Sequence, residues 1–250
     1  MIEEAVYDLS ELARANWHVH TNRSSCAAFD MSPEQILAQA EFHDLRMVAL
    51  VDHHHKRRHP IVRDVKRVRK AVERFNPRLK VLVGAELSAY GGGRYSDSKR
   101  MNRKVGYRLY ACNHYHVPGW EHPEELSARA YAEHVLHVLT ALLHAGRADA
   151  VAHPFVGSYL KAQLDEPTSV TRAISDRELG EVLELGRRNE IAWEINTRTA
   201  FEDPDFTRRY WNVGREVGVV FRLGTDAHSL AQIDTRRHAE QLQALLGGAA

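Results

Sequence analysis

Short apolar segments alternate with amphipathic segments of helical period from one end of this chain to the other. The apolar segments read as buried strands, and the segments between them repeat apolar residues at the spacing of helix turns. Strands are expected at residues 16–20, 47–52, 80–87, 106–112, 149–153, 191–196 and 219–225. Such alternation predicts a parallel α/β architecture. Roughly seven strand–helix units are closer to a barrel than to an open sheet, but periodicity alone does not decide whether the sheet closes.

Capping residues mark several of the expected helices. Ser32, followed by proline, marks one helix start, and Ser175 with Glu178 forms the reciprocal capping pattern of another. A long helix is expected over residues 123–145. No Pro-, Gly- or Ser-rich linker interrupts the series, so residues 1–250 are expected to form a single domain.

Composition narrows the possible partners of the chain. The formal net charge of +1 provides no global field for nucleic acid or acidic membranes. Two cysteines, Cys26 and Cys112, are too few for a disulfide framework. No apolar run approaches the ~20 residues of a membrane helix, and the start lacks a basic segment followed by an apolar one. A cytoplasmic protein without a membrane partner is therefore expected.

Histidines and carboxylates end nearly every expected strand, and the chain has 16 histidines. In a parallel barrel the C-terminal ends of the strands share one face, so these side chains would converge. His18 and His20 would point to the same side of their strand, which is a chelating geometry. The other residues at strand ends are Asp52, His53, Glu86, His114, His116, His153, Asp226 and His228.

A shared metal centre explains these residues better than a separate structural role for each of them. A lone His-x-His pair or a single buried carboxylate is more often structural than metal-binding, but their joint occurrence at successive strand ends favours a site. Imidazole nitrogens with a few carboxylates suit zinc, iron or manganese, whereas an all-oxygen set would suit magnesium or calcium.

The order of these motifs resembles that of the polymerase and histidinol phosphatase (PHP) superfamily. The resemblance extends from Trp17 to Ser229. Its six segments are HVHT at 18–21, VDH at 51–53, GAE at 84–86, the region of His114, AHP at 152–154 and GTDAHS at 224–229. The resemblance implies a distorted (β/α)7 barrel with up to three metal ions at the C-terminal face of its strands.

The resemblance also implies particular ligands. They are His18, His20, Glu86 and Asp226 for one ion, Glu86, His114 and His153 for a second, and His53, His228 and a loop residue for a third. Family members often have His or Asp in that loop, where this chain offers Cys26. Cys26 is either a thiolate ligand suited to zinc or a small apolar residue. We therefore expect two or three divalent ions, of zinc, manganese or iron. On the fourth strand, His114 fits the pattern better than His116, although alternation places both on one face.

The implied activity is that of a metal-dependent phosphoric ester hydrolase. Paired divalent ions, about 3.5 to 4 Å apart in such sites, activate water as hydroxide and clamp a phosphoryl group. Glu86, Asp226 and His228 are the expected catalytic residues: Glu86 as the bridge, Asp226 to orient the water and His228 to help protonate the leaving group. Asp52 is expected to support the imidazole of His53.

A small phosphomonoester is the expected substrate. The segment 194–197 resembles the histidinol phosphatase branch, which makes histidinol phosphate one candidate among several. Arg198 could bind a phosphate oxygen through its planar fork, or form a surface ion pair instead. Arg94 belongs to a Gly-rich loop, 91–104, that would help select the substrate if it folds over the metals.

Three other functions remain open. Basic residues at 56–70 and 91–104, with nearby tyrosines, could bind nucleic acid and so indicate a phosphodiesterase or exonuclease, but a solvated helix face and a mobile lid are the simpler interpretation. A catalytically silent, regulatory metal-binding barrel would have lost several ligands. An amidohydrolase also begins with His-x-His but often has a metal-bridging lysine, and no strand-end lysine is evident.

Overall fold

Seven parallel strands form the centre of the molecule in the computed structural model, which describes residues 4–55, 60–155, 160 and 163–247. They follow one another around the sheet in the order β1-β2-β3-β5-β6-β7-β8, and β4 pairs with β3 in antiparallel orientation. The strands are β1 (Ala15–Val19), β2 (Met47–His54), β3 (Lys80–Gly91), β4 (Arg94–Tyr95), β5 (Tyr107–Ala111), β6 (Ala150–Val151), β7 (Ala192–Asn196) and β8 (Phe221–Gly224).

The sheet nearly closes on itself between β8 and β1. Val19 and Ala227 form a parallel bridge, in which the His20 backbone N–H donates to Ala227 O at 2.9 Å. Further down the same seam, Asn16 Nδ2 donates to Thr225 Oγ1 at 2.7 Å, and the Thr225 N–H donates to Asn16 Oδ1 at 3.2 Å. A buried side chain thus takes the place of ladder hydrogen bonds. The expectation of a distorted, single-domain (β/α)7 barrel is confirmed.

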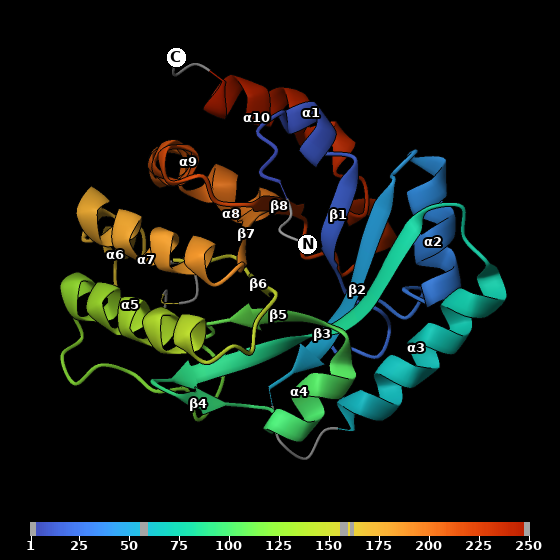
Figure 1. Cartoon of the computed structure of the whole chain (residues 1–250), viewed down its shortest axis with the longest axis horizontal. Helices are drawn as coiled ribbons and strands as arrows, with labels where there is room; N and C mark the ends of the chain where they lie inside the picture. Colours follow the sequence, from blue (N-terminus) through green and yellow to red (C-terminus); the bar gives the residue numbers. More distant parts are fainter. Residues whose placement is uncertain (1–3, 56–59, 156–159, 161–162, 248–250) are drawn as a thin grey trace.

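Helices surround the barrel (Figure 1). The principal ones are α2 (Pro33–Phe42), α3 (Ile61–Phe75), α5 (Ala128–His144), α7 (Asp176–Arg188) and α9 (Pro204–Val217). The shorter ones are α1 (Leu9–Leu12), α4 (Lys99–Val105), α6 (Ser169–Arg172), α8 (Thr197–Glu202) and α10 (Ala239–Leu246), with 3-10 turns η2 (Leu230–Gln232) and η3 (Arg236–His238). Ser32 caps α2 and Ser175 forms a complete capping box with Glu178 on α7, as the sequence predicts. The part of the chain that is described contains no helix long and apolar enough to cross a membrane.

The buried side chains form one layer between the barrel and its helices and another inside the barrel. Large apolar residues such as Leu139, Trp193 and Phe221 fill the space between the strands and the outer helices. Inside the barrel, a separate cluster combines small residues such as Ala49 and Ala150 with the larger Tyr107 and Leu109. Polar side chains occupy the C-terminal ends of the same strands.

Several expected boundaries differ in the structure. The helix expected from residue 123 begins at Ala128, because Ser127 caps it. β6 has only two residues of the expected 149–153. β3 continues past Leu87 to Gly91 and turns into a hairpin with β4, and α4 follows, so residues 91–104 are not one long loop. The basic residues Lys56, Arg57 and Arg58 lie outside the described part of the chain.

Candidate metal centre

The C-terminal ends of the barrel strands bring distant histidines and carboxylates into one pocket. Alternation along β2 directs Ala49, Val51 and His53 inward, and Glu86 on β3 pairs in register with His53. His18, His20, Glu86, His114 and His153 are all buried. Groups of these ligand atoms lie within 4.8 Å of one another in four combinations: His18, His20 and Glu86; Glu86, His114 and His153; His20, His53 and His228; and His18, His153 and Glu194.

The first group has the spacing of a coordination sphere. Nε2 of His18 and Nε2 of His20 are 3.0 Å apart, and each lies 3.3 Å or less from Asp226 Oδ1. Glu86 Oε2 is 3.6 Å from the first nitrogen and 3.7 Å from the second. Ligands bound to zinc at about 2.0 to 2.2 Å in a tetrahedron are about 3.4 Å from one another. The ligand atoms of His18, His20 and Glu86 therefore fit one cation, and Asp226 Oδ1 lies next to both imidazoles.

Glu86 also contacts a second group of imidazoles. Its other oxygen, Oε1, is 3.2 Å from His153 Nε2 and 3.5 Å from His114 Nε2. Glu86 Oε2 is buried and receives no hydrogen bond of good geometry from the described residues, although His53 Nδ1 lies 2.5 Å away. A buried carboxylate oxygen surrounded by nitrogen lone pairs suits a cation. One carboxylate thus faces two neighbouring sets of nitrogen ligands.

The third group lies nearest the surface. His53 Nε2 is 3.3 Å from His228 Nε2, and His20 completes the set. Cys26 approaches both outer histidines. Burial raises the pKa of its thiol, but hydrogen bonds from His228 and His53 outweigh this and lower the pKa to about 6. Cys26 is exposed and lies beside His53 and His228, but it is not a member of any group of potential ligands in the described part of the chain.

Glu194 is a site residue that the sequence analysis does not single out. Its Oε1 lies 2.9 Å from His18 Nδ1, and its Oε2 accepts a 2.5 Å hydrogen bond from the backbone N–H of His153. By engaging Nδ1 of His18, it directs the lone pair of Nε2 toward the pocket. A carboxylate directly after the apolar segment 191–193 of an expected strand is the signal that could have revealed it.

Asp52 has a different role from the expected one. The alternation of β2 turns its carboxylate away from the pocket, where it accepts hydrogen bonds at 2.8 Å from Thr21 and Ser24. Ser24 Oγ in turn accepts from the His53 backbone N–H at 3.1 Å and lies 3.3 Å from His20 Nδ1. Asp52 therefore orders the loop after β1 and acts toward His20, not on the imidazole of His53.

Two of the strand-end residues have left-handed backbone conformations. φ is +26° at His153 and +52° at Asp226. Such conformations are unfavourable for residues other than glycine and occur often at functional sites. His153 follows the end of β6 by two residues, and Asp226 follows the end of β8 by two residues.

Electrostatics hold the carboxylates in their ionised form. Burial raises the pKa of Glu86, but the imidazoles of His53 and His114 and hydrogen bonds from His153 and His18 hold it well below its usual value. Burial also raises the pKa of Asp226, which His18 and His20 lower far more. Burial lowers the pKa of His114 well below its usual value, which favours the neutral imidazole that binds metals.

The structure distinguishes among the additional histidines. His114 is buried with its Nε2 facing Glu86, whereas His116 is exposed. His54 points outward, and its Nε2 lies 3.2 Å from Ser96 O. Nδ1 of His55 is 3.0 Å from Ser88 Oγ. Of these four, only His114 belongs to a group of potential ligands in the described part of the chain.

The two arginines expected to bind substrate have different surroundings. Arg198, 3.5 Å from Glu202, lines a cavity whose wall also includes Asp226 and His228. Arg94 on β4 pairs with Glu121 and lies over the ring of Tyr90. It does not line the cavity beside Asp226. The structure thus brings Arg198, but not Arg94, to the edge of the histidine cluster.

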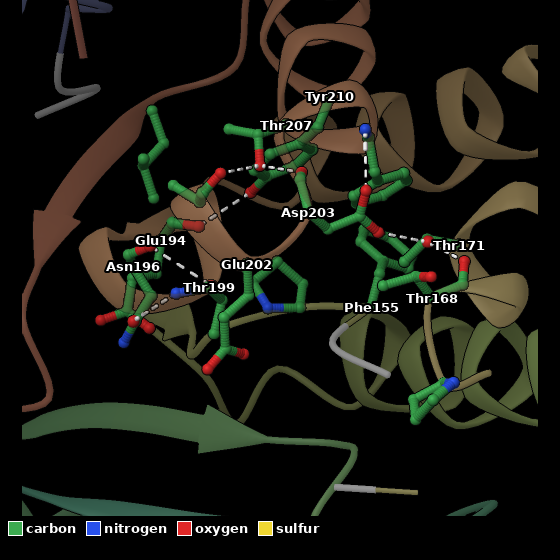
Figure 2. A pocket seen from close by; sticks show the side chains of 15 residues that line it. Phe155, Thr168, Thr171, Glu194, Asn196, Thr199, Glu202, Asp203, Thr207 and Tyr210 are labelled. Carbon is green, nitrogen blue, oxygen red and sulfur yellow. Dashed lines mark hydrogen bonds between the residues drawn. The ribbon is translucent and has the colours of Figure 1, made fainter. Parts of the chain in front are cut away.

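A second cavity, of about 260 Å³, lies beside β7 under α8 and α9 (Figure 2). Phe155, Phe206 and Tyr210 form its aromatic wall. Its polar groups bond mostly to one another: Thr171 Oγ1 donates to Asp203 Oδ2 at 2.6 Å, and Tyr210 Oη donates to Glu194 O at 3.2 Å. This cavity offers packing space next to the site but few unengaged polar atoms.

Comparison with known proteins agrees with the fold. No family model and no curated protein sequence matches the chain. Among solved structures it is similar to histidinol phosphate phosphatase (HISK) from Lactococcus lactis subsp. lactis Il1403, determined in complex with zinc, L-histidinol and phosphate. The TM-score is 0.60 at 16% sequence identity, over 91% of this chain and 92% of the other. The likeness shows a shared fold. The described residues of this protein include several clusters of His and Glu that could bind metal.

Proposed function

We propose that this chain is a metal-dependent phosphoesterase of the PHP type that hydrolyses a small phosphomonoester. The observation that carries the proposal is Glu86, a buried carboxylate with His18 and His20 near one oxygen and His114 and His153 near the other. A carboxylate between two nitrogen-rich sets is the arrangement of a bridged pair of cations. The likeness to a phosphatase solved with zinc supports this proposal at the level of the fold.

The residues would divide the metal-binding task. His18, His20, Glu86 and Asp226 would hold one ion, Glu86, His114 and His153 a second, and His53, His228 and Cys26 a third. Zinc, manganese or iron at these positions would supply activated water and polarise the phosphoryl oxygens. Glu194 would keep the His18 ring in its binding orientation.

Asp226, His228 and Arg198 would act on the substrate. Asp226 has its carboxylate at the edge of the first group, ionised by its histidine neighbours, and can accept a hydrogen bond from the attacking water. His228 Nδ1 is 2.7 Å from Asp226 O, which directs Nε2 of the ring toward the third group. Without an ion at the third position, this nitrogen would be able to pass a proton to the leaving oxygen. Arg198 can bind a phosphate oxygen from the cavity wall.

Histidinol phosphate is one candidate substrate, because the similar structure contains L-histidinol and phosphate. A phosphodiesterase acting on nucleic acid is a second candidate. It is favoured by a set of cations on α3 and α4 that have no carboxylate partner within 4.0 Å in the described part of the chain. These are Arg63, Lys66, Lys70, Lys99, Arg100, Arg103 and Lys104.

The test compares three substrates after metal removal and reconstitution with zinc, manganese or iron. Turnover of p-nitrophenyl phosphate, without turnover of bis-p-nitrophenyl phosphate or single-stranded DNA, is the expected result. The reverse pattern would replace the phosphomonoesterase by the phosphodiesterase. Bound metal without turnover of any phosphoester would leave a silent metal-binding barrel.

A further inference from the structure

A cavity of about 480 Å³ opens beside the histidine cluster and is lined by Arg198, Asp226, His228, Gln232, Arg237 and their neighbours. Its volume is in the range of small-molecule sites. Asp226 and His228 form the side toward the cluster. The cations Arg198 and Arg237 stand elsewhere in the wall, and they come from α8 and from η3, after two different strands. A ligand whose phosphate lies at the histidine cluster could therefore place a second anionic group in this cavity.

Arg237 lies on a segment that is firmly attached to the barrel. Gln232 Oε1 accepts hydrogen bonds from the backbone N–H groups of His228 and Ser229, at 2.8 and 3.0 Å. Ile233 O accepts a 2.9 Å bond from the buried amide of Asn16. Thr235 Oγ1, also buried, donates to Ala13 O at 2.7 Å. These attachments hold the segment after β8 in place before any ligand binds, which lowers the entropic cost of binding.

The adjacent residues Arg236 and Arg237 differ in their surroundings. Arg236 points away from the cavity and pairs with Asp44 at 3.2 Å. Arg237 lies on the cavity wall, where Nη1 donates to Ala231 O at 2.7 Å and Nε donates to His238 Nε2 at 3.0 Å. No carboxylate of the described residues lies within ion-pair distance of Arg237. Its charge is therefore not neutralised by the protein, whereas Arg198 shares its charge with Glu202.

We propose that Arg237 binds a second anionic group of the substrate, a carboxylate or another phosphate, several atoms from the phosphate that is hydrolysed. This inference rests on the proposed phosphatase function and deepens it, since it predicts a preference for phosphomonoesters that carry two anionic groups. The guanidinium offers a planar pair of donors suited to either group. Arg237 would thus be a specificity-determining residue that does not act on the reacting atoms.

The kinetic test uses matched substrates that differ only in the second anion. They are 3-phosphoglycerate against glycerol 3-phosphate, and glucose 1,6-bisphosphate against glucose 6-phosphate, measured with the metal-loaded wild type, Arg237→Met and Arg236→Met. The kcat/KM ratio within at least one pair should favour the doubly anionic substrate in the wild type. In Arg237→Met this ratio should fall roughly 10- to 100-fold, the range for a lost hydrogen bond to a charged group. Arg236→Met should keep the wild-type ratio.

The kinetic ratios show whether Arg237 binds a second anion and of which kind. A fall in the first pair identifies a carboxylate as the second anion, and a fall in the second pair identifies a phosphate. An unchanged ratio in Arg237→Met, or an equal fall in Arg236→Met, would overturn the proposal, the latter because it would indicate a general disturbance of the segment.

A binding measurement separates this inference from the proposed function. If none of the substrates is turned over, the phosphatase proposal fails, and calorimetry with non-hydrolysable ligands still tests the subsite. The metal-loaded wild type should bind 3-phosphonopropionate or 1,3-propanediphosphonate at least about tenfold more tightly than propylphosphonate. This preference should disappear in Arg237→Met and persist in Arg236→Met. Equal binding of all three ligands by the wild type would refute the subsite.

Discussion

Single side chains at the candidate metal centre have more than one partner, and this is why small substitutions there should have large effects. Glu86 faces five imidazoles, and Glu194 engages both the ring of His18 and the backbone of His153. The sequence predicts the first of these carboxylates through its position at a strand end. It does not predict the second, because a lone acidic residue in a strand gives no indication of which ring it will meet.

Glu86→Gln should abolish the proposed activity. The amide keeps the shape of the side chain but cannot bridge two cations, so turnover of p-nitrophenyl phosphate should fall by more than about 100-fold. Metal content, measured by elemental analysis, should fall with it. Glu216→Gln, on the exposed face of α9, is the matched control. Full activity in Glu86→Gln would exclude the proposed mechanism.

Glu194→Gln tests the support of His18 separately. One carboxylate oxygen faces a ring N–H and the other a backbone N–H, so an amide must turn its NH2 group toward one of these donors. Metal affinity, measured by competition with a chelator, should fall about 10- to 100-fold. Retention of wild-type affinity would indicate that Glu194 does not orient the ring.

At the scale of elements, the helix starts at Ser32 and Ser175 are predicted correctly from the sequence, the start at Ser127 is not, and the lengths of the strands depend on their neighbours. α7 begins where its capping box predicts. β6 is short because the chain turns at His153, and the β3–β4 hairpin forms because β3 extends beyond its parallel neighbours. Caps are local interactions between residues three apart, but the length of a strand depends on pairing partners that are distant in sequence.

Ser175→Ala should destabilise the protein by about 1 kcal/mol, the usual effect of losing a helix cap. The Ser175 side chain accepts from the Glu178 backbone N–H, and the Glu178 carboxylate accepts from the Ser175 N–H. Urea unfolding would measure the change. Ser10→Ala is the control, since its side chain does not cap a helix.

The contribution of the same capping box to the free energy of unfolding should depend on pH. Hydrogen bonds from Arg129 and Ser175 lower the pKa of Glu178 from 4.5 to about 2. Its contribution is therefore complete above pH 4.5 and is lost as the pH falls toward 2. The difference in unfolding free energy between the wild type and Glu178→Gln should be constant near neutral pH and should narrow below pH 4.5. A difference that widens on acidification would contradict the assignment.

For the whole molecule, closure of the barrel determines whether the site can form, because it brings the first and last strands together. The amide of Asn16 makes four hydrogen bonds, to Thr225 Oγ1 and Ile233 O as donor and from the backbone N–H groups of His18 and Thr225 as acceptor. The proposed ligands His18 and His20 come from one side of this seam, and Asp226 and His228 come from the other.

Asn16→Ala should therefore weaken both the fold and the site. It leaves several buried polar groups without partners, each at a cost of about 1 to 3 kcal/mol, so the urea midpoint should fall markedly. Asn212→Ala on α9 serves as the comparison, and it should have little effect. If Asn16→Ala were as stable as the wild type, the side chain would not be what closes the seam.

Metal removal should also affect the entire molecule. Ions that bind the folded state alone stabilise it by about 4 kcal/mol at 1,000 times their dissociation constant. The melting temperature should fall on dialysis against a chelator and recover with zinc or manganese. In Glu86→Gln the recovery should be smaller. An unchanged melting temperature would mean that the cluster binds no ion tightly.

The sequence alone determined the alternation of strands and helices, the helix caps and the positions of the chemically active residues at strand ends. These features follow from local periodicity and short-range hydrogen bonding, which act between neighbours along the chain. The tertiary structure decided the closure through Asn16, the roles of Glu194 and Asp52, and the placement of Arg237 and Asp226 in the wall of one cavity. These features depend on contacts between residues far apart in sequence, so they are determined only when the barrel closes.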